Sequence, residues 1–219
     1  MKKAPKAKKL KLGLVGTGIA ARRLYLPAFE ALRDRIELVA CTNRRRSKAV
    51  AYARLAGVGR VVDSAEELFA LPEVEAVVIR LPIEAQPAYV LRALAAGKAV
   101  LSEKPIAPSV AEGRKLVKAA ARFDVPWLVG ENFAFMPHVA RLGAWLAQGK
   151  LGVVRLVQAT QITVMDAKNP YFATAWRQKP KFVGGFNALA GGLVTPDGDP
   201  GHGTHIAGNA LRVAAPLGA

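Results

Sequence analysis

Cysteine, acidic residues and long apolar runs are scarce in this chain of 219 residues. The single cysteine, Cys41, excludes a disulfide within the chain. No apolar run has the length of a signal peptide or of a membrane span, so we expect a cytoplasmic protein that makes no membrane contact. With 52% hydrophobic and 22% charged residues, the chain is too apolar to be disordered. Its length suits one α/β domain plus part of another.

The shortage of acids leaves a strong positive charge. Lysine and arginine number 32 against 16 acidic residues, which gives a net charge of +16. Six lysines lie within residues 1–11, and we expect residues 1–9 to form a flexible basic tail. No nucleic-acid motif with interleaved aromatic residues accompanies this charge, so specific nucleic-acid binding is not predicted. General attraction to polyanions remains an alternative that needs only charge.

The stretch Leu10–Ala21 carries the first functional signal. A short apolar strand leads into Gly16-x-Gly18-x-x-Ala21 and then into a helical pattern, the order that a dinucleotide-binding turn requires. Gly16 suits a tight turn, and Gly18 has no side chain to keep a pyrophosphate from the backbone amides of the helix start. The plainer alternative is an ordinary strand-turn-helix. The residues predicted to contact the cofactor here are Gly16, Thr17, Gly18, Ile19 and Ala20.

The end of the second expected strand, Ile36–Cys41, bears on cofactor choice. An acid there would bind the ribose hydroxyls of NAD, but the chain continues Thr42-Asn43-Arg44-Arg45-Arg46. Arginine can pair with a phosphate in a fork geometry, so we expect NADP, with NAD as the alternative, and contacts from Asn43 and Arg44. A solvated basic loop is the competing interpretation.

Strand and helix patterns alternate through the first 130 residues. This alternation predicts a Rossmann-type α/β fold with a doubly wound parallel sheet over 10–130. Further strands are expected at 61–62, 76–81, 98–102 and 125–130. Helices are expected at 19–32 with a kink at Pro27, at 47–56 with a cap at Ser47, after Asp63 or Ser64, and at 84–96, 109–123 and 137–148.

The segment Gly97-Lys98-Ala99-Val100-Leu101-Ser102-Glu103-Lys104-Pro105 follows an expected helix. Together with the glycine turn, Trp176-Arg177 and Gly184-Gly185, it resembles the Gfo/Idh/MocA oxidoreductase family. The resemblance implies that Lys104 lies in the active site, near the cofactor ribose and the substrate hydroxyl, and that a cis peptide precedes Pro105. A lysine there would stabilise a developing alkoxide as hydride leaves the adjacent carbon. Further predicted cofactor contacts are Leu81, Pro82, Glu103, Lys104, Trp176 and Arg177.

A second domain is expected over residues 131–219. The alternating stretch 151–164 predicts a half-exposed strand, and the whole segment suggests a partial α+β domain for substrate binding and oligomerisation. The family's second domain is larger than this remainder, so the resemblance implies an incomplete pocket and a homo-oligomer or a poorly ordered end. Trp176-Arg177 resembles the family's pocket-lining pair, whereas a tryptophan packed at a sheet edge is the alternative.

The resemblance weakens after Gly185. The family has an aspartate and a histidine about one helical turn apart, for proton transfer. Aligning His205 with that histidine puts Gly201 at the aspartate, so the acid partner would be missing or replaced by Asp199. The segment around His202 also resembles the histidine motif of subtilisin-like proteases, but no serine follows Ser109 to act as a nucleophile.

A metal site built from the two histidines, Asp197 and Asp199 is a further alternative. The sequence therefore predicts an NAD(P)-dependent oxidoreductase that acts on a sugar, polyol or related small molecule. Lys104, His205 and Asp199 are its candidate catalytic residues. A protein that binds the cofactor without catalysis is the main alternative.

Overall fold

The computed structural model describes residues 8–155 and residue 170. It divides the chain into two units, Met1–Gly130 and Glu131–Ala219, and each is described by itself. Several predicted site residues lie outside the described residues, namely Trp176, Arg177, Asp197, Asp199, His202 and His205.

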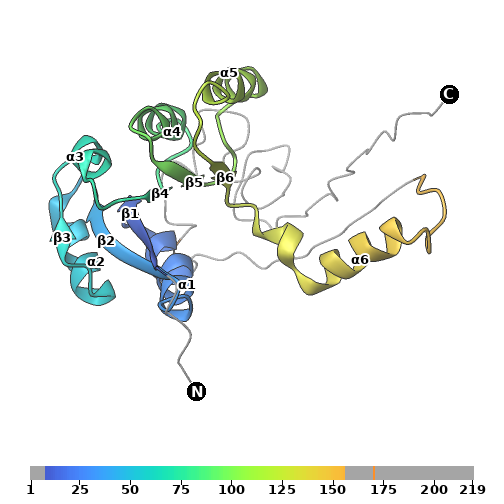
Figure 1. Ribbon diagram of the computed structural model, residues 1–219, viewed down its shortest axis with the longest axis horizontal. Coiled ribbons are helices and arrows are strands. Elements are labelled where there is room, and N and C mark those ends of the chain that lie inside the picture. The colour runs from blue at the N-terminus through green and yellow to red at the C-terminus, as the bar shows by residue number, and fades with distance from the viewer. Residues whose placement is uncertain (1–7, 156–169, 171–219) are drawn as a thin grey trace, which may run out of the picture. The chain divides into compact units, whose positions relative to one another are not determined.

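The first unit is built on a six-stranded parallel sheet with the strand order β3-β2-β1-β4-β5-β6 (Figure 1). The chain runs outward from the centre to one edge and then returns to build the other half, which is the doubly wound arrangement. The predicted Rossmann-type fold is thus confirmed. The strands are β1 (Leu10–Val15), β2 (Ile36–Thr42), β3 (Arg60–Val61), β4 (Ala76–Ile79), β5 (Ala99–Ser102) and β6 (Trp127–Val129).

Helices cover both faces of this sheet, and each face has its own apolar core. One core contains buried residues of α3 (Ala65–Ala70), α4 (Gln86–Ala95) and α5 (Val110–Ala120). The other contains buried residues of α2 (Arg46–Ala56) and of the π-helical turn η1 (Ala21–Tyr25), and Phe29 of α1 (Leu26–Ala31) packs against it. Both faces of the central strands are therefore apolar, as a parallel sheet requires.

Strand β4 contributes residues to both apolar cores. All four of its residues are buried. Val77 and Ile79 belong to the core with α3, α4 and α5, whereas Ala76 and Val78 belong to the core with α2. Because successive side chains of a strand point to opposite faces, a continuous apolar run is needed here rather than an alternating one.

Helix ends differ from the sequence prediction at a few places. Ser47 was expected to cap α2, but the capping position is Arg45, so this expectation was wrong. The amide of Arg45 donates to the side-chain oxygen of Asn43 at 3.0 Å, and this local turn starts the helix earlier than expected. Ser64 caps α3 by accepting from the amide of Glu67 at 3.0 Å.

Other boundaries shift by a few residues. Strand β4 ends at Ile79, two residues before the predicted end, and α4 begins at Gln86 rather than at residue 84. The expected kink near Pro27 is a change of helix type: η1 ends at Tyr25, and α1 begins with Pro27 in its first turn.

The described part of the second unit contains a short 3-10 helix, η2 (Asn132–Phe135), and α6 (Pro137–Ala147). A strand was predicted over 151–164. Residues 151–155 contain a turn and no strand, so that part of the prediction was wrong, and residues 156–164 lie outside the description.

Candidate functional site

Gly16 forms the turn at the carboxyl end of β1. Its φ of +96° is a conformation that residues with a side chain rarely adopt, and a Cβ there would lie 2.3 Å from the carbonyl oxygen of Arg80. The Gly16 amide donates to the Thr42 carbonyl at 2.9 Å, and the Arg80 amide donates to the Val15 carbonyl at 2.7 Å. The turn therefore packs directly against the ends of β2 and β4, which leaves no room for a larger residue.

The position of Gly18, unlike that of Gly16, is open. A Cβ at Gly18 would meet no other atom within 4 Å. The Arg22 amide donates to the Gly18 carbonyl at 3.2 Å, so the helical stretch that includes Ile19 and Ala20 begins here. Open space beside the first amides of a helix is where the phosphate groups of a dinucleotide bind. The residues present thus fit a dinucleotide, because they leave this space free of side-chain atoms.

Asn43 connects the loop after β2 to the glycine turn. Its side-chain nitrogen donates to the hydroxyl of the buried Thr17 at 3.1 Å, while its oxygen accepts from the Arg45 amide. Arg44 and Arg45 are exposed next to this bond. Arg46 forms an exposed ion pair with Asp63. The loop after β2 therefore presents two exposed arginines at the same sheet edge as the glycine turn, where they are available to an anion.

The turn Glu103-Lys104-Pro105 begins where β5 ends, so it lies at the same carboxyl edge of the parallel sheet as the glycine turn. The peptide bond between Lys104 and Pro105 is cis, which confirms that expectation. Lys104 is half-buried. The side-chain amide of Gln86 makes hydrogen bonds to the backbone on both sides of Lys104.

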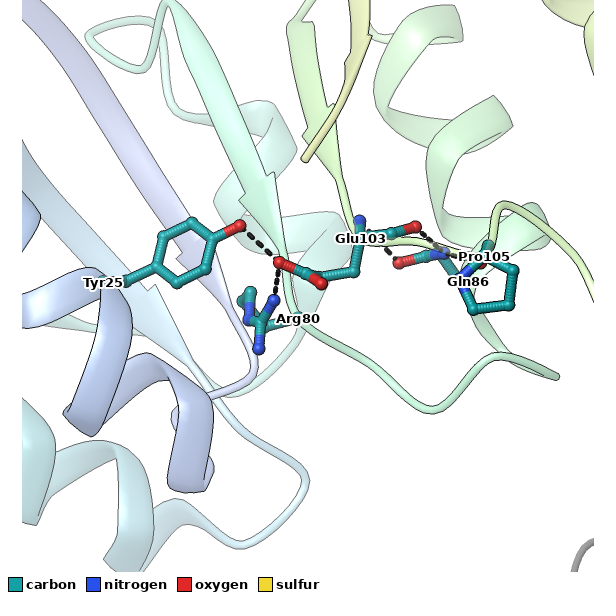
Figure 2. A network of polar contacts seen from close by, with 5 residues as sticks. All are labelled: Tyr25, Arg80, Gln86, Glu103 and Pro105. Carbon is teal, nitrogen blue, oxygen red and sulfur yellow. Dashed lines mark hydrogen bonds and ion pairs between the residues drawn. The ribbon is translucent and has the colours of Figure 1, made fainter. Parts of the chain in front are cut away.

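The carboxylate of Glu103 has two partners from other elements (Figure 2). It accepts a hydrogen bond of 2.6 Å from the hydroxyl of Tyr25 in η1, and it forms an ion pair with Arg80 after β4. The Arg80 guanidinium also lies over the Tyr25 ring, 4.5 Å from its centroid. Burial raises the pKa of the Tyr25 hydroxyl, and the nearby Arg80 charge offsets part of that rise. Tyr25 therefore stays protonated and donates to Glu103 at neutral pH.

Glu103 was predicted as a cofactor contact, and the structure shows that its carboxylate binds protein groups. Of the other predicted contacts after β4, Leu81 is half-buried and Pro82 is exposed. The structure thus gathers Gly16–Ala20, Asn43, Arg44, Leu81, Pro82, Glu103 and Lys104 at the carboxyl ends of β1, β2, β4 and β5.

Sequence reasoning missed Tyr25, Arg80 and Gln86. One signal for Arg80 was available, because it is the single charged residue in the apolar run 76–81. Gln86 gave a weaker signal as a polar residue at the start of a helix.

Among residues 8–155 and residue 170, no group of three or more His, Cys, Asp or Glu side chains could hold a metal ion, and no helix is long and apolar enough to cross a membrane.

Comparison with known proteins gives a family match over the first unit. Residues 10–131 match the model described as "Oxidoreductase family, NAD-binding Rossmann fold", under the heading GFO_IDH_MocA. The chain is 35% identical to dehydrogenase FPY6 of Fusarium mangiferae over 80% of its own length and 53% of that protein. It is 31% identical to 1,5-anhydro-D-fructose reductase of Ensifer adhaerens over 79% of its length and 50% of that enzyme.

Solved structures show the same similarity. An oxidoreductase of Thermotoga maritima has a TM-score of 0.78 at 39% identity, covering 84% of this chain and 57% of that one. The 3-ketoreductase KijD10 of Actinomadura kijaniata, solved with NADP and TDP-benzene, has a TM-score of 0.62 at 26% identity, covering 73% and 49%. The chain thus spans about half the length of the curated relatives it matches.

Proposed function

This chain belongs to the Gfo/Idh/MocA oxidoreductase family, and from that premise we propose that it binds NADP and transfers hydride between the cofactor and a carbinol or carbonyl carbon. The observation that carries this proposal is the glycine turn, with open space at Gly18 at the same sheet edge as the Lys104 turn. A nicotinamide cofactor supplies the hydride when bound. The substrate class proposed is a sugar, polyol or related small molecule, in keeping with the names of the reductases above.

The preference for NADP over NAD rests on the loop after β2. Exposed Arg44 and Arg45 follow Asn43, and no acid is present in this loop to bind the ribose hydroxyls of NAD. A 2′-phosphate would pair with Arg44 in a charge-assisted contact. KijD10 was solved with NADP, which supports the same choice.

Titration of NADPH and NADH into the full chain, followed by nicotinamide fluorescence, tests the cofactor. We expect tighter binding of NADPH. Arg44→Ala removes a charge-assisted contact worth about 2 kcal/mol, so the affinity for NADPH should fall about thirtyfold while that for NADH stays constant. The matched control is Arg33→Ala, which removes an exposed charge from the turn before β2, at the opposite edge of the sheet. Equal losses for both cofactors, or tighter binding of NADH, would contradict the arginine argument.

The proposed role of Lys104 is to donate a hydrogen bond to the substrate oxygen. Its positive charge stabilises the negative charge that develops on that oxygen as hydride moves, and His205 exchanges the hydroxyl proton, with Asp199 as its proposed partner. Turnover on a panel of sugars and polyols should fall by about a hundredfold or more in Lys104→Ala and in His205→Ala, to a residual rate that can still be measured. Lys115→Ala, an exposed change on α5, should leave the rate unchanged. Cofactor binding without turnover of any panel member would instead favour the catalytically silent alternative.

A further inference from the structure

Gln86 is a polar side chain in the interior of the first unit. It lies at the start of α4 with 1% of its surface exposed. A buried amide is costly unless its donors and acceptor are all bonded. The side chain of Gln86 meets this condition with backbone groups alone, and all of those groups belong to the turn that contains Lys104 (Figure 2).

The three hydrogen bonds surround the lysine. The Gln86 nitrogen donates to the carbonyl of Glu103 at 2.6 Å and to the carbonyl of Pro105 at 2.9 Å. The Gln86 oxygen accepts from the Glu103 amide at 2.9 Å. One planar side chain therefore binds the 102–103 and 103–104 peptide groups on one side of Lys104 and the 105–106 peptide group on the other, so it restrains the backbone that flanks the lysine.

A second set of contacts holds the same turn from the other side. The Glu103 carboxylate is bound by Tyr25 and Arg80, and the Arg80 side chain is only 11% exposed. Gly130 completes this arrangement, because a Cβ there would lie 3.2 Å from the Tyr25 hydroxyl and 3.3 Å from the Glu103 carboxylate. Glu103 is therefore held by its side chain through Tyr25 and Arg80 and by its backbone through Gln86.

We propose that Gln86 is a positioning residue for Lys104, which acts on the reaction by holding the Glu103–Pro105 backbone and touches neither cofactor nor substrate. This inference rests on the proposed role of Lys104. Because hydride transfer depends steeply on the placement of the reacting groups, a displacement of about 1 Å at the lysine would lower kcat by up to about a hundredfold. Binding of the cofactor at the glycine turn would change little.

The first test measures the turn itself. In the NMR spectrum of the full chain, exchange of the Glu103 amide proton with solvent should be slow, because that proton is bonded to buried Gln86. Gln86→Met is close in size and removes all three bonds, so it should speed this exchange and shift the Lys104 amide signal. Gln148→Met makes the same chemical change at an exposed position and should do neither. Fast exchange in the unaltered chain, or an unmoved Lys104 signal in folded Gln86→Met, overturns the proposal.

The second test asks whether Gln86 acts through the lysine. On a panel member that the unaltered chain reduces, Gln86→Met should lower kcat about tenfold or more and leave the dissociation constant of NADPH within about twofold. In a Lys104→Ala background the same change should have no further effect on kcat. An equal loss of kcat in both backgrounds would show that Gln86 acts independently of Lys104 and would overturn the proposal.

A second variant and the NMR measurements distinguish failure of this proposal from misfolding of a variant and from failure of the proposed function. If Gln86→Met fails to fold, Gln86→Glu keeps the size and the acceptor but removes both donors, and the expected shift of Lys104 and loss of kcat are the same. If no panel member is turned over, the proposed function fails. The NMR measurements on Glu103 and Lys104 still decide whether Gln86 places the lysine.

Discussion

The two glycines of the turn after β1 should respond in opposite ways to the same substitution. Gly16→Ala should destabilise the fold by about 3 kcal/mol. About 1–2 kcal/mol of this comes from a side chain in the left-handed region of φ, and a further 1–3 kcal/mol comes from overpacking. The contact cannot relax easily, because the Cβ would meet the Arg80 carbonyl oxygen, which is backbone, at 2.3 Å.

Gly18→Ala is the matched control within the same turn. Its Cβ would enter open space, so stability should change by less than about 0.5 kcal/mol. By the proposed function, however, that methyl group would occupy the space of the pyrophosphate and weaken NADPH binding. Gly16→Ala thus tests the packing of the turn, and Gly18→Ala tests what the turn binds.

Urea unfolding, followed by far-ultraviolet circular dichroism, measures the difference. With a slope of about 2 kcal/mol per molar urea, the midpoint for Gly16→Ala should fall by about 1.5 M, while that for Gly18→Ala stays within about 0.3 M of the unaltered chain. NADPH titration of Gly18→Ala completes the comparison. A Gly16→Ala midpoint close to that of the unaltered chain, or equal losses in both variants, would refute the packing argument.

Two more predictions concern stability. Burial raises the pKa of the Cys41 thiol to about 11 from 9.0. The unfolded chain therefore loses this proton first, so the contribution of Cys41 to stability is complete below pH 9 and is lost as the pH rises from 9 to 11. Urea unfolding at several pH values should show a smaller decline over this window in Cys41→Ala, and an identical decline would contradict it. Ser64→Ala and Ser109→Ala, which remove helix caps, should each lower the free energy of unfolding by about 1 kcal/mol in the same assay. Ser47→Ala should lower the free energy of unfolding by less than half of that amount, because Ser47 lies within α2 and does not cap it.

The order and type of the elements were predictable from the sequence because the signals are local. Apolar runs such as 76–81 are long enough to identify buried strands, and Gly57 and Gly97 adopt the positive φ expected at helix ends. The start of α2 was not predictable from Ser47 alone, because the bond from Arg45 to Asn43 competes with the serine cap.

The candidate site was predictable only in part. Glycine spacing and the Glu103-Lys104-Pro105 motif are contiguous in sequence, so their grouping at one sheet edge followed from the fold. The partners of Glu103 could not be inferred in the same way, since Tyr25 lies 78 residues away. The pairing depends on the strand order, which brings the ends of β4 and β5 beside η1, and on a close approach that no local pattern encodes.

The central place of β1 has a consequence for how the protein is made. This strand leaves the ribosome before the other described strands of the sheet, and β2, its neighbour on one side, follows soon after it. Its other neighbour, β4, pairs with it through Ala76–Ile79, which are synthesised only after α2, β3 and α3. During that interval one side of β1 has unpaired amide and carbonyl groups, next to the glycine turn. Among the described strands, β1 waits longest for its second neighbour, so the nascent chain is most open to mispairing there.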